Sequence, residues 1–297
     1  MPDAAVMQAG SVPVRAKKNS KVLQVLKQMS YNRMAMLGAV ILLIEVVLVL
    51  LAPLIAPYSY STIDMSVAMQ GPSLAHPFGT DDVGRDILSR ILIGGRYSLG
   101  MGILSILISM VLGISIGSIA GYFGGTVDNL IMRFLDIVQS MPGMLMTIVL
   151  STVLGPGYFN TILALAINNI PSNARLLRAQ MLKVRENEYI EAARSINCNK
   201  LQIIVKHLIP NSFSPLIVTS TMGVAHMITA AAGLSFIGLG VQPPTPEWGA
   251  MLSASRQFIR SSPHMVIFPG LAIAITVLSL NLMGDGLRDA LDPKLKR

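Results

Sequence analysis

The sequence predicts an all-helical membrane protein with six transmembrane helices. Hydrophobic residues make up 52% of the 297 residues, charged residues only 13%, and the mean hydropathy is +0.60. This composition is too apolar for a soluble domain, and the apolar residues fall in runs long enough to cross a bilayer. The basic residues behind the net charge of +8 flank these runs, so the charge indicates orientation in the lipid bilayer and not nucleic-acid binding.

The N-terminal part is predicted to cross the membrane once. Residues 1–33 carry many basic residues against a single acidic one, Asp3, and are predicted to be a cytoplasmic segment. The apolar run 34–56 is too long for the core of a cleavable signal, so it is the first transmembrane helix. Residues 57–97 then turn polar and are predicted to be an extracytoplasmic region.

A five-helix core is predicted within residues 98–283. Its spans cover about 98–120, 130–154, 159–181, 213–237 and 265–283. Asn168, Asn169 and Pro171 predict a kink in the fourth span, with its polar side facing protein or water. Six spans put both termini on one side. The basic residues of the N-terminal segment, of 175–206 and of the tail 284–297 predict that this side is the cytoplasm.

A charged, amphipathic stretch at 187–210 interrupts this core. Asn187 is expected to cap a helix, and Asn197, which tolerates a left-handed conformation, to end it. Asn199 and Gln202 then form a predicted capping box for a second helix. A small, flat docking face with charged edges is expected on the first helix. The residues of the face are Tyr189, Ala192, Ala193 and Ile196, and those of the edges include Glu191 and Arg194.

The motif Glu191-Ala192-Ala193, with Ile209-Pro210 after the turn, resembles the EAA loop of permease subunits of binding-protein-dependent ABC importers. Asn197 stands where the family has glycine. Three further stretches resemble the second permease subunit of the dipeptide, oligopeptide and nickel class. They are GTDDVGRDILSR at 79–90, LSFIGLGVQPPTPEWGAML at 234–252 and NLMGDGLRDALDPKLKR at 281–297.

The resemblance implies a type I ABC importer permease fold in the bacterial plasma (inner) membrane. It implies a homologous second permease, two cytoplasmic ATPases and an extracytoplasmic solute-binding protein as partners. The loop at 187–210 would hold the coupling helix that sits in the ATPase. The implied coupling residues are Tyr189, Glu191, Ala192, Ala193, Arg194, Ile196 and Asn197. No cofactor is expected on this chain, since ATP and Mg²⁺ would be bound by the ATPases.

Polar residues in the other segments suggest two further sites. Six residues of the fourth and fifth spans are candidates for lining a pathway: Asn168, Asn169, Thr219, Ser220, His226 and Thr229. Four outer residues are candidates for contacting the binding protein: Asp82, Arg85, Asp86 and Trp248. Their alternative interpretations are helical ion pairs, with 82 facing 86 and 86 facing Arg90, and an interfacial tryptophan anchor. Glu45, deep in the first span, is an interface residue or a solute ligand.

Catalytic motifs are missing from the sequence. No G-x-x-x-x-G-K-[ST] stretch can hold ATP phosphates, no G-x-S-x-G elbow offers a nucleophile, and the four histidines have no metal-binding spacing. A single cysteine, Cys198, excludes an internal disulfide. A permease is therefore preferred over a secondary transporter, which favours intramembrane carboxylates, and over a membrane-embedded enzyme. Peptides, nickel and metal chelates all remain possible solutes.

Overall fold

The computed structural model describes residue 25 and residues 27–291, so most of the predicted N-terminal segment and the end of the tail lie outside the described residues. Long helices dominate the described part. They are α2 (Arg33–Ile55), α3 (Ile87–Phe123), α4 (Gly125–Gln139), α5 (Gly143–Leu154), α6 (Tyr158–Arg185), α10 (Ser214–Phe236) and α12 (His264–Leu291). Shorter helices are α7 (Glu188–Ser195), α8 (Lys200–Gln202), the π-helix Ile203–Leu208, α9 (Ile209–Ser212), α11 (Trp248–Ser255) and two 3₁₀ turns (Met65–Val67 and Arg256–Phe258).

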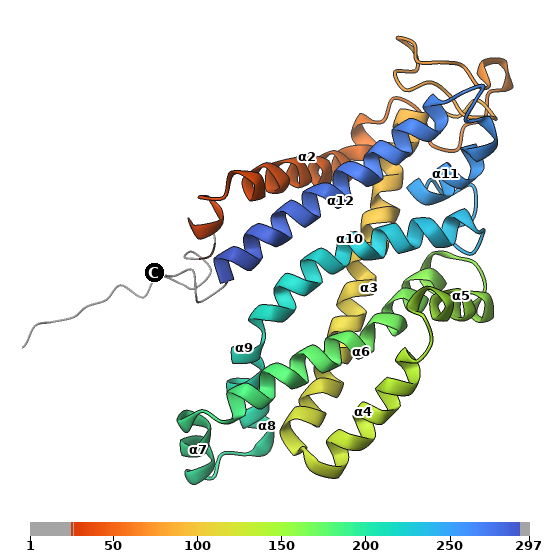
Figure 1. Cartoon of the computed structure of the whole chain (residues 1–297). Helices are drawn as coiled ribbons and strands as arrows, with labels where there is room; N and C mark the ends of the chain where they lie inside the picture. Colours follow the sequence, from red (N-terminus) through yellow and green to blue (C-terminus); the bar gives the residue numbers. More distant parts are fainter. Residues whose placement is uncertain (1–24, 26, 292–297) are drawn as a thin grey trace, which may run out of the picture.

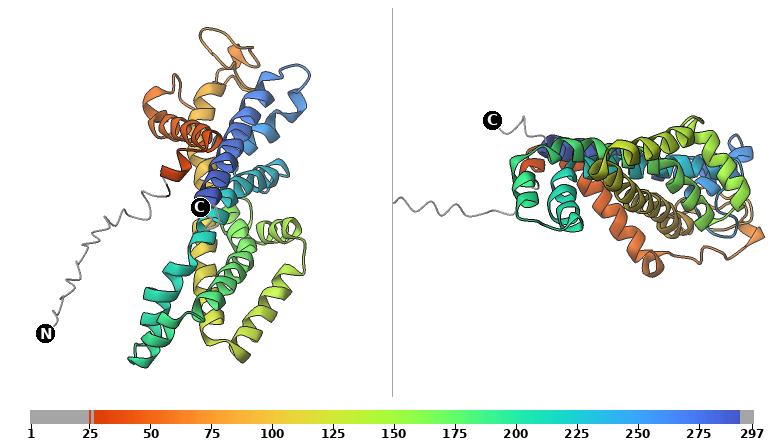
Figure 2. Two further views of the ribbon diagram at one scale, coloured as in Figure 1. Left: turned by 60° about the vertical axis from the view of Figure 1, so that its left-hand side comes forward. Right: turned by 90° about the horizontal axis from the view of Figure 1, so that it is seen from below.

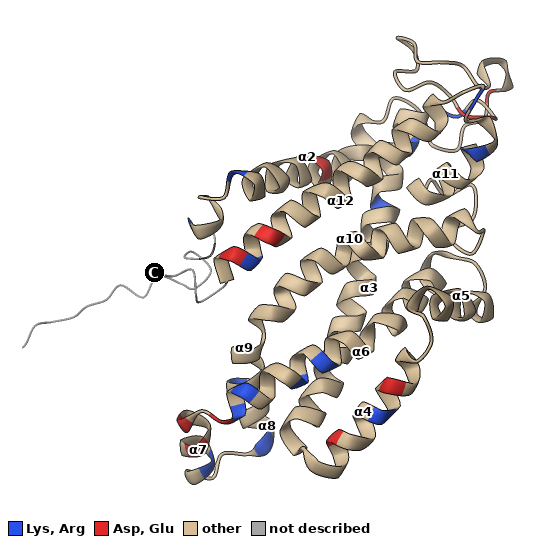
Figure 3. Ribbon diagram, viewed as in Figure 1, with Lys and Arg blue, Asp and Glu red and all other residues tan. Residues whose placement is uncertain are grey.

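The long helices form one elongated bundle. Helices α12, α10 and α6 run side by side across the long α3, and α2 lies along α12 (Figure 1). Figure 2 shows the α7–α9 region projecting at one end and the segment between α2 and α3 at the other. Charged residues gather at these two ends, along α4, and where α2 begins and α12 ends (Figure 3). This distribution fits a bundle whose middle lies in lipid.

Helices occupy all six predicted spans, but two of them differ from the prediction. Helices α2, α3, α10 and α12 are each long and apolar enough to cross a membrane. The predicted span 130–154 is broken, because α4 and α5 meet at a bend of 83° around Pro142. Helix α6 is long enough but carries too many polar residues to meet the same criterion, and it continues through Pro171.

Helix α3 begins well before the predicted start of the second span. Asp86 accepts a hydrogen bond from the backbone N–H of Ser89 at 2.7 Å, which caps the helix at this earlier point. Further along, a stripe of glycines lets α6 approach closely. A Cβ on Gly113 would lie 2.6 Å from Cβ of Asn173, and one on Gly117 would lie 2.4 Å from the Ala174 carbonyl oxygen. This is the small-residue packing typical of membrane helices.

Helix α2 lies against α12 in the same manner. A Cβ on Gly286 would lie 2.1 Å from Cβ of Ala35, and one on Gly38 would lie 2.7 Å from the Ser279 carbonyl oxygen. Midway along the contact, the Thr276 hydroxyl donates a hydrogen bond to Oε1 of Glu45, whose Oε2 is buried without a partner in the described chain. The structure therefore places Glu45 between two helices of this chain.

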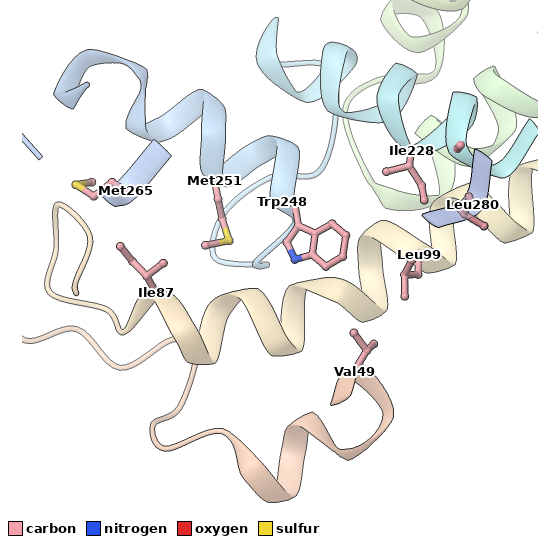
Figure 4. Close-up of a cluster of buried hydrophobic side chains, with 9 residues drawn as sticks. Val49, Ile87, Leu99, Ile228, Trp248, Met251, Met265 and Leu280 are labelled. Carbon is pink, nitrogen blue, oxygen red and sulfur yellow. The ribbon is translucent and has the colours of Figure 1, made fainter. Parts of the chain in front are cut away.

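Trp248 lies in the outer core and not at a surface. It is 1% exposed and packs among Ile87, Met251 and other apolar side chains, as Figure 4 shows. Its indole N–H donates to the Ile91 carbonyl at 2.9 Å. Both predictions for Trp248, an interfacial anchor and a binding-protein contact, are therefore wrong. Sequence alone could not show that α11 folds back against α3.

Candidate functional site

A stripe of five residues on α10 faces three adjoining hollows. These residues, spaced three or four apart so that they share one helix face, are Thr219, Met222, His226, Thr229 and Gly233. The hollows have volumes of about 450, 260 and 420 Å³. Met222 lines the first two, whereas His226 and Thr229 line the second and third. This "α10 stripe" thus borders a chain of cavities along most of the helix.

The third hollow brings together predicted pathway residues from two helices. Asn168 of α6 lines it together with His226 and Thr229 of α10, and Thr147 of α5 lies in the same wall. The Thr229 hydroxyl donates to the Ala225 carbonyl of its own helix at 3.0 Å, which leaves its lone pairs for the hollow. Within residues 27–291 the side chains of Asn168 and His226 make no hydrogen bond. Polar groups without partners in an apolar wall are available to a ligand.

Two predicted pathway residues are turned into the bundle instead. The Asn169 amide lies 3.4 Å from the Ser109 hydroxyl oxygen, and the Ser220 hydroxyl lies 3.3 Å from the sulfur of Met110. Both contacts are with α3, so these residues connect helices. Asn168 precedes Asn169 by one position, and Thr219 precedes Ser220 by one position. One position along a helix rotates the side chain by about 100° around the helix axis, so each neighbour faces another direction.

Several polar residues at the hollows were not predicted, and Asn281 is the one among them that shares a hollow with His226 on a third helix. Asn281 of α12 lines the second hollow opposite His226 and makes no side-chain hydrogen bond with the described residues. The signal was present in the sequence, because Asn281 is a lone amide within an apolar run like Asn168.

The second candidate site is the "docking elbow", residues 187–210. Asn197 has φ of +56°, which confirms the predicted left-handed stop, and the Cys198 N–H closes the turn on the Ala193 carbonyl at 3.1 Å. Asn199 accepts from the Leu201 N–H at 3.3 Å and caps α8. The reciprocal bond from the Gln202 side chain that the predicted capping box requires is absent among the described residues. The Asn187 side chain does not cap α7. It donates to the Val184 carbonyl of the preceding helix at 2.9 Å.

The structure divides the predicted docking face of α7 between an exposed side and a buried side. Tyr189 and Ile196 are 45% and 77% exposed, and Ala192 lies on the same exposed side. Ala193, in contrast, is 5% exposed and packs with Ile190 in an internal cluster. The other buried members of that cluster are Leu177, Met181, Ile203, Leu208 and Leu216. Ala193 therefore anchors α7 to the bundle and does not belong to the outward face.

Arginines of α6 hold the base of the elbow in place. Arg178 makes two hydrogen bonds to Asp128 of α4, the first from Nε to Oδ1 at 2.7 Å. Arg185 donates to the carbonyls of Gly121 and Tyr122 at the end of α3. These contacts connect α3, α4 and α6 just before the elbow begins. Bidentate pairs of this kind fix geometry as well as adding stability.

Most of the outer residues predicted to contact a binding protein already make hydrogen bonds or ion pairs within this chain. Asp86 is 2% exposed and caps α3, and its Oδ1 lies 3.0 Å from Nδ1 of His76. The predicted pairing of Asp86 with Arg90 is absent, because Asp81 takes both arginines, with Arg85 at 2.6 Å and Arg90 at 3.7 Å. Only Asp82, with its side chain 34% exposed, remains accessible among the predicted outer charges.

Glu247 is a buried carboxylate that sequence analysis did not identify. It is 1% exposed and accepts hydrogen bonds from the N–H groups of Gly249 and Ala250, at 2.8 and 2.7 Å, which caps α11. The hydroxyls of Ser98 and Ser235 donate to it at 3.1 and 2.8 Å. Glu247 thus joins α11 to α3 and α10. No helix was predicted at 248–255, and glutamate is not among the residues that usually cap helices, so the sequence offered no clear signal for this role.

Apolar spanning helices around a grooved helix define the class as a multi-pass membrane transport subunit. The chain belongs to the family of binding-protein-dependent transport system inner membrane components, whose family model matches residues 113–297. Residues 22–77 match the N-terminal TM domain of oligopeptide transport permease C. The chain is accordingly a non-catalytic permease subunit of an ABC importer, located in the bacterial inner membrane and working with ATPase and binding-protein partners.

Two named relatives cover most of the chain. The dipeptide transport system permease protein DppC of Alkalihalophilus pseudofirmus is 45% identical over 270 residues, which cover 91% of this chain and 89% of the relative. The glutathione transport system permease protein GsiD of Pectobacterium atrosepticum is 45% identical over 266 residues, covering 89% and 88%. The predicted family and class are confirmed.

Solved structures show the same fold at low sequence identity. An inward-facing MetNI methionine ABC transporter chain aligns with a TM-score of 0.56 and 18% identity, covering 69% of this chain and 98% of the other. An amino acid ABC transporter crystallised with histidines aligns with a TM-score of 0.51 and 15% identity, covering 67% and 92%. The predicted type I importer permease fold is thereby confirmed.

Proposed function

We propose that this chain forms half of the pathway by which an importer moves peptides or a related small solute. The observation that carries the proposal is the α10 stripe, along which three hollows follow one another between α5, α6 and α12. A homologous second permease would close the other half. Thr219, His226, Thr229 and Asn168 line the path, whereas Asn169 and Ser220 hold its wall together.

Peptides are the solute class that the relatives support. The names of the two relatives specify a dipeptide and glutathione, which is itself a short peptide. Identity of 45% over about nine-tenths of this chain supports a solute of related chemistry. Substrate choice would be shared with the binding protein.

Two cytoplasmic ATPases, which bind ATP and Mg²⁺, are proposed to sit one on each permease. The exposed side of the elbow is the proposed seat of the ATPase that binds this chain. Tyr189, Ala192 and Ile196 form its apolar centre, and Glu191 and Arg194 orient the contact by charge. Asn197 provides the sharp turn behind it. Because Ile190 and Ala193 lock α7 onto α6 and α10, closure of the ATPases is transmitted to the α10 stripe.

Both termini are proposed to lie in the cytoplasm. The elbow and the last turn of α6 before it carry basic residues, whereas the segment between α2 and α3 lies at the opposite end of the bundle (Figure 3). We assign 1–33 and 284–297 to the cytoplasm and 57–86 to the outside, where the binding protein would meet Asp82. Cys198, the single cysteine, tests this: a membrane-impermeant maleimide should label inside-out vesicles only. Labelling of right-side-out vesicles would contradict the orientation.

Purification of the importer through a tag on this chain tests the function. We expect a second permease and ATPases to copurify, and proteoliposomes with the binding protein to take up labelled dialanine only when ATP is supplied. Uptake driven by an ion gradient, without ATP and without a copurified ATPase, would indicate a secondary transporter instead.

A further inference from the structure

Around the middle of the α10 stripe lie three polar side chains, one of α10 and two of neighbouring helices, that have no hydrogen-bond partner in the described part of the chain. Asn168 and His226 line the hollow of about 420 Å³, and His226 and Asn281 line the neighbouring hollow of about 260 Å³. They come from three different helices, α6, α10 and α12. His226 therefore lies where the two hollows meet, with an amide on either side.

These three groups share one chemical property, which is a donor together with an acceptor. Asparagine offers an amide N–H₂ and a carbonyl oxygen, and a neutral imidazole offers one N–H and one free nitrogen. The hydroxyls of two nearby threonines, Thr147 and Thr229, donate their hydrogen bonds to the Gly143 and Ala225 carbonyls of their own helices. The free donors in this region are thus those of the three side chains, while the two threonine oxygens remain as acceptors.

Charge is missing from the same walls. None of the described residues that line the two hollows is Asp, Glu, Lys or Arg. The remaining lining is apolar, with Met144, Leu165, Met227 and Val277 among its members. A charged peptide terminus placed here would lose hydration without gaining a counter-charge, which is costly. A neutral group with one donor and one acceptor would instead be well matched.

We propose that Asn168, His226 and Asn281 form a polar cluster that recognises the main-chain amide of a passing peptide. The inference rests on the proposed function and adds to it which part of the solute this permease contacts. The apolar lining accommodates side chains by contact alone, and methionines adapt to different shapes. Selection at this point therefore depends on the presence of an amide and not on the charge of the termini.

The test compares two probes in the reconstituted importer with its binding protein. One is dialanine, and the other is its ester analogue, alanyl-lactate, which lacks the amide N–H. The uptake of a probe by each variant is divided by the uptake of the same probe by the parent importer. Discrimination between the probes by the binding protein then cancels from the ratio. Asn168→Leu and Asn281→Leu should each lower dialanine uptake by about 3- to 10-fold, the value of one neutral hydrogen bond. The variant that loses the acceptor of the amide N–H should show little change for the ester, which has no such N–H.

Thr221→Val is the matched control, because Thr221 lies on another face of α10 in a different hollow. It should leave both probes at the parent level. Equal losses for both probes in the Asn168 and Asn281 variants, or no loss in either, would overturn the inference while leaving peptide transport intact. Loss of the copurified second permease would also overturn it, by showing that the cluster is a subunit contact. A parent importer that moves neither probe would reject the peptide proposal and this inference together.

Discussion

The guanidinium of Arg96 donates a hydrogen bond from Nε to the carbonyl oxygen of Val49 at 3.0 Å. Val49 lies four residues before Pro53 in α2, and proline has no N–H to bond that carbonyl. Arg96 also donates from Nη2 to the Leu50 carbonyl at 2.7 Å. An arginine of α3 thus bonds the carbonyl that a proline leaves without an N–H donor in a neighbouring apolar helix.

We expect Arg96→Leu to destabilise the contact between α2 and α3 by about 1–3 kcal/mol, because it leaves the Val49 carbonyl without a donor. The measurement is thermal unfolding of the purified importer in detergent. In a Pro53→Ala background the helix regains an N–H for Val49, so the same arginine substitution should cost measurably less. Strictly additive effects of the two substitutions would show that Arg96 does not act through the Val49 carbonyl.

Glu247→Gln is expected to destabilise the outer end of the bundle by about 1–3 kcal/mol. The carboxylate accepts from two backbone N–H groups and two serine hydroxyls, and an amide would turn one acceptor into a donor facing other donors. Faster proteolysis near α11 in right-side-out vesicles would report the change. Glu188→Gln, at an exposed carboxylate of α7, is the control and should leave stability unchanged. Equal behaviour of the two variants would contradict a structural role for Glu247.

The sequence predicted the helical membrane fold and the places of its four apolar spanning helices, because apolar runs are local signals. It also predicted the turn at Asn197, which depends only on one residue's backbone preference. It failed where the answer depends on which way a side chain turns. Trp248 and Ala193 are buried by helices distant in the chain, and Asp86 is used as a cap before a helix that starts earlier than expected. No local pattern contains that information.

Two threonines of α10 test the pathway with matched chemistry. Thr229 and Thr221 each donate to the carbonyl four residues earlier, at 3.0 and 2.9 Å, but only Thr229 borders the hollows along the α10 stripe. Thr229→Val should lower ATP-driven dialanine uptake about 2- to 5-fold by removing an acceptor from the wall, whereas Thr221→Val should not. Similar uptake by both variants would show that the α10 stripe does not contact the solute.

Ala192 and Ala193 are adjacent in sequence, but Ala192 is exposed and Ala193 is buried, so glutamate substitutions should have different consequences. Ala192→Glu places a charge on the exposed side, where it should weaken ATPase retention in copurification and lower uptake while the amount of folded permease stays normal. Ala193→Glu places the charge inside the cluster with Ile190 and Leu208. An unpaired buried charge costs several kcal/mol, so this variant should lose the fold of the elbow itself and become sensitive to protease on the cytoplasmic side. If Ala192→Glu retained ATPases at the parent level with full uptake, the outward side of α7 would not be the coupling surface, even though the inward side is correctly assigned.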